Sequence, residues 1–309
     1  MPHQSNGIIV IDKPAGISSA KAVAIVKKAL KVRKAGHTGT LDPFATGVLV
    51  CCLNNATRIA DFLIKNKKQY EAVLHLGIET DTEDITGKTI ATCDKINFSN
   101  KGINSAFKRF NGKIEQIPPV YSALKHKGVP LYKLARQGKP VKKPARSVTI
   151  FDIEILDINL PEIRFKVQCS AGTYIRTLAS DIGKTLGCGG HLKSLRRIQS
   201  GRFSVNDSIK LDEVEKLSLL KRNCDILSDK IIGMTNALPE IPAFHADDIQ
   251  AARIKNGCIM TGHDFPYDYN AFGNGTAKII DKKNNLIAIV NYNNENNIYK
   301  YHVVFNNDL

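Results

Sequence analysis

Apolar residues along the chain fall into two patterns that predict strands. Gly7–Ile11 (GIIVI) and Gly47–Leu53 (GVLVCCL) are continuous apolar runs, as expected of strands inside a sheet. Tyr70–Leu76 and Ile163–Cys169 alternate apolar with polar positions, which predicts strands with one buried face. Val148–Ile158 is expected to be a further strand. Sheet-forming segments are therefore distributed from residue 7 to residue 169.

Other segments have apolar residues at helical spacing. Val23, Val26 and Leu30 recur three or four residues apart. They follow Ser18 and Ser19, either of which can cap the start of a helix. The other predicted helices are a short one containing Phe107 and Phe110 that ends near Gly112, Thr173–Leu186 with Gly187 as its stop, and Glu213–Arg222.

Two prolines, Pro239 and Pro242, mark the expected domain boundary. We expect a large domain over residues 1–238 and a small β-rich domain over residues 239–309. Within the small domain the pattern predicts a helix at Asp247–Lys255 and strands near Thr276–Ile280, Leu286–Tyr292 and Ile298–Phe305.

The positive charge is concentrated before this boundary. The chain carries a formal net charge of +15, yet residues 241–309 contain six Lys/Arg and seven Asp/Glu. Gln116–Phe151 contains eight Lys/Arg and no acidic residue, and Ile182–Asn206 contains five and again none. Such one-signed tracts favour a polyanionic partner, with an idle basic surface as the alternative. Five prolines within Gln116–Phe151 argue against an amphipathic membrane helix.

Composition bears on the cellular location of the protein, on disulfide formation and on metal binding. No apolar run reaches the ~18–20 residues that a membrane-spanning helix needs, and the N-terminus lacks the features of a secretory signal. The seven cysteines are scattered, which favours reduced thiols in a cytoplasmic protein. Cys188 and His191 have a ligand-like spacing, but one pair does not make a tetrahedral site, so no metal is expected.

The loop Ala35–Thr46 is the segment best suited to carry chemistry. It lies between a basic helix and a buried strand, so both of its ends are fixed. Asp42 precedes Pro43, which disfavours helical geometry at the aspartate and stiffens it. Nearby glycines allow a ligand to approach the backbone. The alternative is an ordinary turn, because Asp-Pro commonly starts one.

The same segment, GHTGTLDPFATGVL at residues 36–49, resembles the signature loop of the TruB-type tRNA pseudouridine synthases. Further motifs of that family have counterparts here in the same order: GIIVIDKPAGISS, KKQYEAVLHLGIETDTEDITG, QIPPVYSALKHKGVPLYKLARQGKPV, SAGTYIRTLASDIG and HLKSLRRIQSGRF. Several long motifs in the right order are far more specific than one short pattern. The resemblance implies an α+β fold, with a mixed, mostly antiparallel central sheet flanked by helices and loops, followed by a small PUA-like domain.

The resemblance also implies an activity and its catalytic residues. The family isomerises uridine 55 in the T loop of tRNA to pseudouridine after flipping the base, and needs no cofactor. Asp42 falls on the catalytic aspartate, and Arg176, in the first turn of its helix, is expected to pair with it and lower its pKa. Tyr70 falls on the tyrosine that stacks on the flipped base. Attack of Asp42 on C6, attack on C1′ and removal of a sugar proton all stay open.

Further residues match substrate-binding positions of the family. His37 is expected to fill the gap left by the flipped base, Tyr174 to close the pocket and Leu195 to pack beside the base. Three more are expected near the substrate strand or the site: Lys13, Arg58 and Asp84.

The implied partner is the T arm of tRNA, gripped by an insertion at about residues 116–147. We expect a monomer that needs no protein partner. A guide-RNA-dependent synthase and a non-catalytic RNA-binding or RNA-folding protein are the two alternatives.

Overall fold

A mixed, mostly antiparallel sheet forms the framework of the computed structural model, which describes residues 6–219, 224–265, 275–293 and 295–305. This sheet has eleven strands among the described residues, so the predicted fold class is confirmed. In spatial order its main path is β14 (Ile209–Lys210), β1 (Gly7–Lys13), β3 (Thr46–Leu53), β12 (Gly190–Ser200), β4 (Lys68–Leu76), β11 (Glu162–Cys169), β10 (Arg146–Asn159) and β7 (Gly112–Gln116). Shorter strands pair beside it: β2 (Ala35–His37) with β3, β13 (Phe203–Ser204) with β12, and β15 (Ile232–Gly233) with β1.

The sheet consists of two halves that meet between β3 and β12. These strands run parallel and pair over only two positions, Arg196 with Thr46 and Arg197 with Gly47. On either side the main-path neighbours are antiparallel, apart from the short parallel pair β1–β14. The loop that precedes β3 therefore opens at the junction of the two halves, where the sheet is least continuous.

Apolar patterns correctly predicted β3 and β4 near this junction, whereas β12, which forms its other side, was not among the predicted strands. Along β4, Tyr70, Ala72, Leu74 and Leu76 are buried while the residues between them are partly exposed. The run Gly47–Leu53 is buried throughout, as expected of an interior strand. A period of two along one strand thus decides which side chains reach the pocket face.

Helices cover each half separately. In the first half α1 (Ser19–Ala29) packs with α6 (Leu211–Leu219) over β1 and β3. In the second half α5 (Ile175–Leu186) and α3 (Asn100–Lys108) cover β4, β11 and β10. Ser18 caps α1 by accepting a hydrogen bond from the Lys21 amide, and Gly187 ends α5 in a left-handed conformation. Residues 220–222 of the predicted helix Glu213–Arg222 lie outside the described residues.

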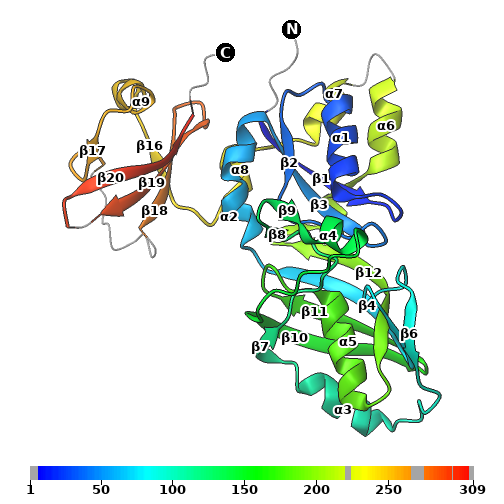
Figure 1. Cartoon of the computed structure of the whole chain (residues 1–309). Coiled ribbons are helices and arrows are strands. Elements are labelled where there is room, and N and C mark those ends of the chain that lie inside the picture. The colour runs from blue at the N-terminus through cyan, green and yellow to red at the C-terminus, as the bar shows by residue number, and fades with distance from the viewer. Residues whose placement is uncertain (1–5, 220–223, 266–274, 294, 306–309) are drawn as a thin grey trace.

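Short elements complete this part of the chain. They are η1 (Asn54–Ile59), α2 (Ala60–Ile64), β5 (Ile78–Thr80), β6 (Thr89–Thr92), β8 (Lys125–His126), β9 (Val129–Pro130), α4 (Leu131–Arg136), η2 (Val205–Asp207), α7 (Cys224–Asp229) and α8 (Met234–Ala237). The insertion that holds β8, β9 and α4 lies at the junction of the two halves of the sheet (Figure 1).

In the described part of the C-terminal lobe five strands form a second sheet, which confirms its expected β-rich character. Its order is β16 (Ala243–His245), β18 (Thr276–Ile280), β19 (Leu286–Asn293), β20 (Ile298–Val304) and β17 (Met260–Thr261), with α9 (Asp248–Lys255) against it. The lobe lies beside α2 and α8 (Figure 1) and shares a hydrophobic cluster with β1 and β3. Buried Lys278 donates to the carbonyls of Thr235 and Leu238, which ties the lobe to the first domain. The boundary at residue 238 stays a prediction.

Within the described residues, no helix has the length and apolar character that crossing a membrane requires.

Candidate active site

The loop that carries Asp42 is held on both sides of that residue. Ser19 in α1 accepts a hydrogen bond from the Leu41 amide at 2.8 Å and donates to the Leu41 carbonyl at 2.9 Å. On the other side the Pro43 carbonyl accepts from the Gly16 amide at 2.8 Å. Of the two serines that could cap the helix, Ser18 caps α1 and Ser19 anchors the loop. Asp42 is therefore presented by a rigid backbone rather than by a mobile turn.

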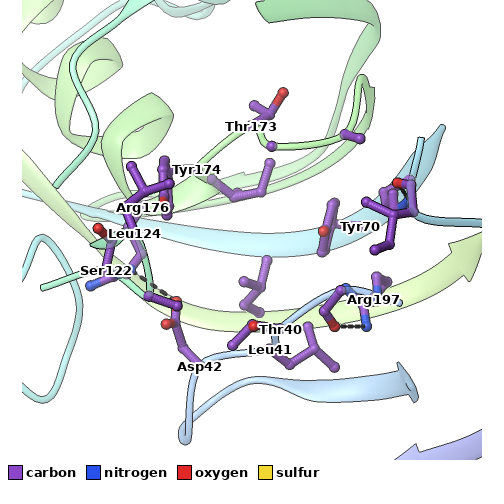
Figure 2. A pocket seen from close by; sticks show the side chains of 18 of the residues that line it. Thr40, Leu41, Asp42, Tyr70, Ser122, Leu124, Thr173, Tyr174, Arg176 and Arg197 are labelled. Atoms are coloured by element: carbon purple, nitrogen blue, oxygen red, sulfur yellow. Dashed lines mark hydrogen bonds and ion pairs between the residues drawn. The ribbon is translucent and has the colours of Figure 1, made fainter. Parts of the chain in front are cut away.

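Asp42 lies in a pocket of about 390 Å³ at the junction of the two half-sheets. That volume lies in the range of small-molecule sites. Figure 2 shows the side chains that surround it, drawn from the Asp42 loop, β4, β12, the start of α5 and the insertion. The predicted residues that the pocket brings together are Asp42, Tyr70, Tyr174, Arg176 and Leu195.

Arg176 is the centre of the site's polar contacts. Its Nε lies 2.9 Å from Asp42 Oδ2, so the expected ion pair is present. Its Nη1 donates to the Thr82 carbonyl at 2.9 Å and to Asp84 Oδ2 at 3.2 Å, and its Nη2 donates to the Tyr121 carbonyl at 2.9 Å. One buried guanidinium therefore joins the Asp42 loop, the loop of Asp84 and the insertion. The planar fork of arginine suits this multiple contact.

The pKa of Asp42 moves opposite to the direction that the ion pair alone predicts. Burial raises it, Arg176 and Lys13 lower it, and the nearby Asp84 carboxylate raises it again, with a net rise above the ordinary value. Arg176 thus lowers the pKa of Asp42 as expected, but burial outweighs its effect. Arg176 shares its charge between two carboxylates, so it does not fully offset the cost of taking Asp42 out of water. The Asp42 side chain still keeps 31% exposure to the pocket.

Tyr70 and Leu195 form the apolar wall of the pocket from adjacent strands. Tyr70 is 8% exposed, and its burial raises the pKa of its hydroxyl while the charge of Arg197 opposes that rise. Leu195 on β12 is also 8% exposed. Tyr174 precedes α5, and its backbone is fixed by two hydrogen bonds to the Gln116 side chain.

Lys13 and Asp84 support the site from behind rather than lining it. Lys13 is fully buried at the end of β1 and donates to the carbonyls of Pro14 and Ile17 at 2.8 Å and of Pro43 at 3.4 Å. Burial lowers the pKa of Lys13 to about 8. Asp84 is 3% exposed and is held by Thr82 and Thr86 as well as by Arg176. Both residues thus position their neighbours, Lys13 the Asp42 loop and Asp84 the guanidinium.

His37 and Arg58 are not among the residues that line the pocket. His37 is half-buried at the end of β2, where its Nδ1 accepts from the Gly39 amide at 3.3 Å, and burial lowers its pKa. Arg58 donates to the Val304 carbonyl at 2.6 Å and stacks over the Phe305 ring at 5.1 Å. Arg58 therefore contacts the C-terminal lobe, and a substrate role for either residue stays a prediction.

Two buried cations were not singled out from the sequence. Arg197 is 2% exposed, lines the pocket and donates to the carbonyls of Val48 at 2.7 Å and Gly39 at 3.0 Å. Lys68 donates to the carbonyls of Ile64 and Asn66, each at 2.6 Å, and burial lowers its pKa to about 8. Period two offers a signal for Arg197, because it lies two residues after Leu195 on the same strand.

The cations of the two basic tracts differ in their exposure and in their ion pairing. Six of the eight cations in residues 116–151 are exposed, and none pairs with a carboxylate among the described residues: Lys125, Lys127, Lys133, Arg136, Lys139 and Lys142. In residues 182–206, by contrast, Lys193 pairs with Glu162, Arg196 pairs with Asp12 at 2.7 Å and Arg197 is buried. In this second tract acids distant in sequence thus pair with two of the five cations, and a polyanionic partner for either tract stays a prediction.

The described cysteines are unpaired thiols, and burial raises the pKa of Cys52 to about 12. Among the described residues no three His, Cys, Asp or Glu side chains gather in a metal-binding arrangement.

Comparison with known protein families identifies the family to which this chain belongs. Residues 27–175 match the family model described as the TruB family pseudouridylate synthase N-terminal domain, and residues 176–238 match the tRNA pseudouridylate synthase B C-terminal domain. The chain belongs to the TruB family of pseudouridylate synthases. The Asp42 loop and Arg176 lie within the matched residues of this TruB chain.

Similar proteins cover most of the TruB chain. It is 44% identical to a tRNA pseudouridine synthase B of Geotalea uraniireducens over 84% of this chain and 83% of the relative. It is likewise 44% identical to one of Francisella philomiragia over 79% of this chain and 81% of the relative. Among solved structures, a Cbf5–Nop10–Gar1 complex has a chain with a TM-score of 0.71 at 29% identity, covering 94% of this chain and 79% of that one. An archaeal box H/ACA Nop10–Cbf5 complex has one with a TM-score of 0.72 at 26% identity, covering 98% and 87%.

Proposed function

We propose that this protein converts uridine to pseudouridine in tRNA, at uridine 55 of the T loop, with Asp42 as its catalytic carboxylate. The observation that carries the proposal is the 2.9 Å pair of Asp42 with Arg176, in a pocket shared with Tyr70 and Leu195. Membership of the TruB family and relatives named tRNA pseudouridine synthase B support tRNA as the substrate.

The chemistry needs one carboxylate and an enclosed nucleotide. The N1–C1′ bond breaks, C1′ joins C5, the C5 proton leaves and N1 ends protonated, so the nucleotide keeps its composition and needs no cofactor. A base stacked in an RNA helix hides this bond, so the nucleotide is flipped out at a cost of a few kcal/mol. Asp42 then acts as nucleophile at C6 or C1′, or as a base on the sugar. Its rigid loop and partial exposure suit each of these roles.

The residues around Asp42 divide the remaining tasks. Arg176 orients the carboxylate, and Tyr70 stacks on the flipped uracil, as aromatic side chains do with unpaired bases. Leu195 and Tyr174 border the base. Lys13 and Asp84 act through the groups that they position. Among the described residues, Asp42 is the single carboxylate that lines the pocket.

The RNA around the flipped nucleotide would contact the insertion. Its exposed lysines and arginine carry no compensating acid within residues 116–151, which suits phosphate binding. His37, next to the Asp42 loop, would fill the gap left in the RNA stack. The C-terminal lobe, with its slight negative charge, would make a secondary contact, and a PUA-like role there belongs to the proposal.

Activity on a bare tRNA transcript is the direct test, since we propose a cytoplasmic monomer that needs neither guide RNA nor protein partner. The similar Cbf5 structures are complexes with protein partners, so a guide-dependent enzyme is the specific rival. That rival forms no pseudouridine on the bare transcript. Mapping pseudouridine in tRNA from cells with and without the gene then locates the target uridine.

Replacement of the carboxylate separates catalysis from binding. Asp42→Asn should reduce pseudouridine formation at least about 10³-fold while tRNA still binds, because the nucleophile or base is lost and the RNA contacts remain. Asp94→Asn, at an exposed aspartate outside the pocket, is the matched control and should retain activity. Full activity of Asp42→Asn would refute Asp42 as the catalytic carboxylate, whereas a wild-type protein that binds tRNA but forms no pseudouridine would be a non-catalytic RNA-binding protein.

A further inference from the structure

One hydroxyl in the pocket has no hydrogen-bond partner. Ser122, in the insertion, is 4% exposed, and its Oγ contacts no donor or acceptor among the described residues. The same residue lines the pocket that holds Asp42. Buried polar side chains in folded proteins are nearly always hydrogen-bonded, and an exception at a binding site needs an explanation. A ligand bound in the pocket would be one source of the missing partner.

The backbone around Ser122 is fixed on both sides. The Tyr121 carbonyl accepts from Arg176 Nη2 at 2.9 Å, and the Ser122 carbonyl accepts from the Tyr132 amide at 3.1 Å. In Figure 2 Ser122 lies next to Arg176 and Asp42. The guanidinium that pairs with Asp42 thus also holds the backbone carbonyl next to Ser122.

A second unpaired atom lies along the same pocket. Arg146 Nε is buried without a hydrogen-bond partner in the described part of the chain, and Arg146 also lines the pocket. Its guanidinium stacks over the Tyr174 ring at 4.9 Å and bonds to the Gly172 carbonyl. Two residues that line one pocket thus each carry a buried polar atom without a partner among the described residues.

We propose that the Ser122 hydroxyl hydrogen-bonds the flipped uridine and positions it against Asp42. This inference rests on the proposed function. A hydroxyl both donates and accepts, so it can pair with the uracil edge or with the ribose 2′-hydroxyl. The contact also links nucleotide binding to the insertion, because Ser122 belongs to the insertion and Arg176 bonds to the neighbouring Tyr121 carbonyl. Ser122 is in this role a substrate-positioning residue of the insertion.

Replacement of Ser122 by alanine distinguishes this role from a structural one. Ser122→Ala removes a hydroxyl that has no partner in the free protein, so the Tm should stay unchanged or rise. The kcat/KM for pseudouridine formation should nevertheless fall about 3- to 10-fold, the effect of losing one neutral hydrogen bond. Ser105→Ala, at an exposed serine of α3 outside both the pocket and the insertion, is the matched control and should leave kcat/KM unchanged. A lowered Tm with unchanged kcat/KM would overturn the proposal.

Substrates with uridine or 2′-deoxyuridine at the target position then locate the bond. If Ser122→Ala weakens binding of both RNAs equally, the partner is the uracil edge; if it weakens only the uridine RNA, the partner is the 2′-hydroxyl. Equal binding of both RNAs by wild type and variant, with unchanged kcat/KM, would refute the contact. Failure of the proposed function gives a different result, since the wild-type protein itself would then form no pseudouridine in tRNA.

Discussion

Two substitutions near Asp42 should shift the pH dependence of activity in opposite directions. Asp42 must be ionised to act as nucleophile or base, so kcat/KM falls as the pH drops through its pKa. Burial and Asp84 raise that pKa, whereas Arg176 and Lys13 lower it. Arg176→Met removes a cation that lowers the pKa, so the acidic limb of the profile should move to higher pH. Asp84→Asn removes a carboxylate that raises it, so the limb should move to lower pH.

The size of the first shift follows from the ion-pair geometry. At 2.9 Å and an effective dielectric constant of about 20, two unit charges attract by about 6 kcal/mol. Full expression of that attraction would move the limb by about four pH units, because one unit corresponds to 1.36 kcal/mol. Asp42 is 31% exposed and Arg176 also serves Asp84, so water and the second carboxylate reduce the effect. We therefore expect a movement of about one to three pH units for Arg176→Met.

The assay is single-turnover pseudouridine formation on a tRNA transcript across the pH range. Thermal unfolding of each variant serves as the control for folding, because Arg176 also donates to the carbonyls of Thr82 and Tyr121. Movement of both limbs in the same direction, or an unmoved limb in a folded Arg176→Met protein, would refute the electrostatic account of this site.

The other predictions concern the sheet junction and the basic insertion. Gly47→Ala should lower the free energy of unfolding by at least about 2 kcal/mol in urea titrations, because φ is +101° and a Cβ would lie 2.2 Å from the Arg197 carbonyl oxygen. Gly128→Ala, at a positive φ with open space, should cost less, and equal losses would contradict the steric argument. Charge reversal at Lys139, Lys142 and Lys143 should weaken tRNA binding and reduce the slope of log K against log salt by about two, whereas an unchanged slope would remove this tract from the interface.

Local patterns identified several of the main elements, though not β12, and family resemblance identified the residues around Asp42, though not Arg197 or Lys68. Period two along β4 placed Tyr70 on the buried face, and the caps at Ser18 and Gly187 bounded α1 and α5 correctly. The Asp-Pro step in a loop with fixed ends pointed to Asp42, and family resemblance supplied its pairing with Arg176. These features depend on neighbours within a few residues, or on motifs long enough to recognise. A single sequence is therefore enough to predict them.

Electrostatics and long-range contacts were decided by the tertiary structure. The pKa of Asp42 depends on burial and on Asp84, and neither its depth nor its distance from a second carboxylate can be read from chain order. Arg196 lies in a sequence tract without acidic residues, yet in the fold β12 and β1 bring it into an ion pair with Asp12. Charge is a property of the residue, but its effect depends on which partners and how much water surround it, and only folding brings those together.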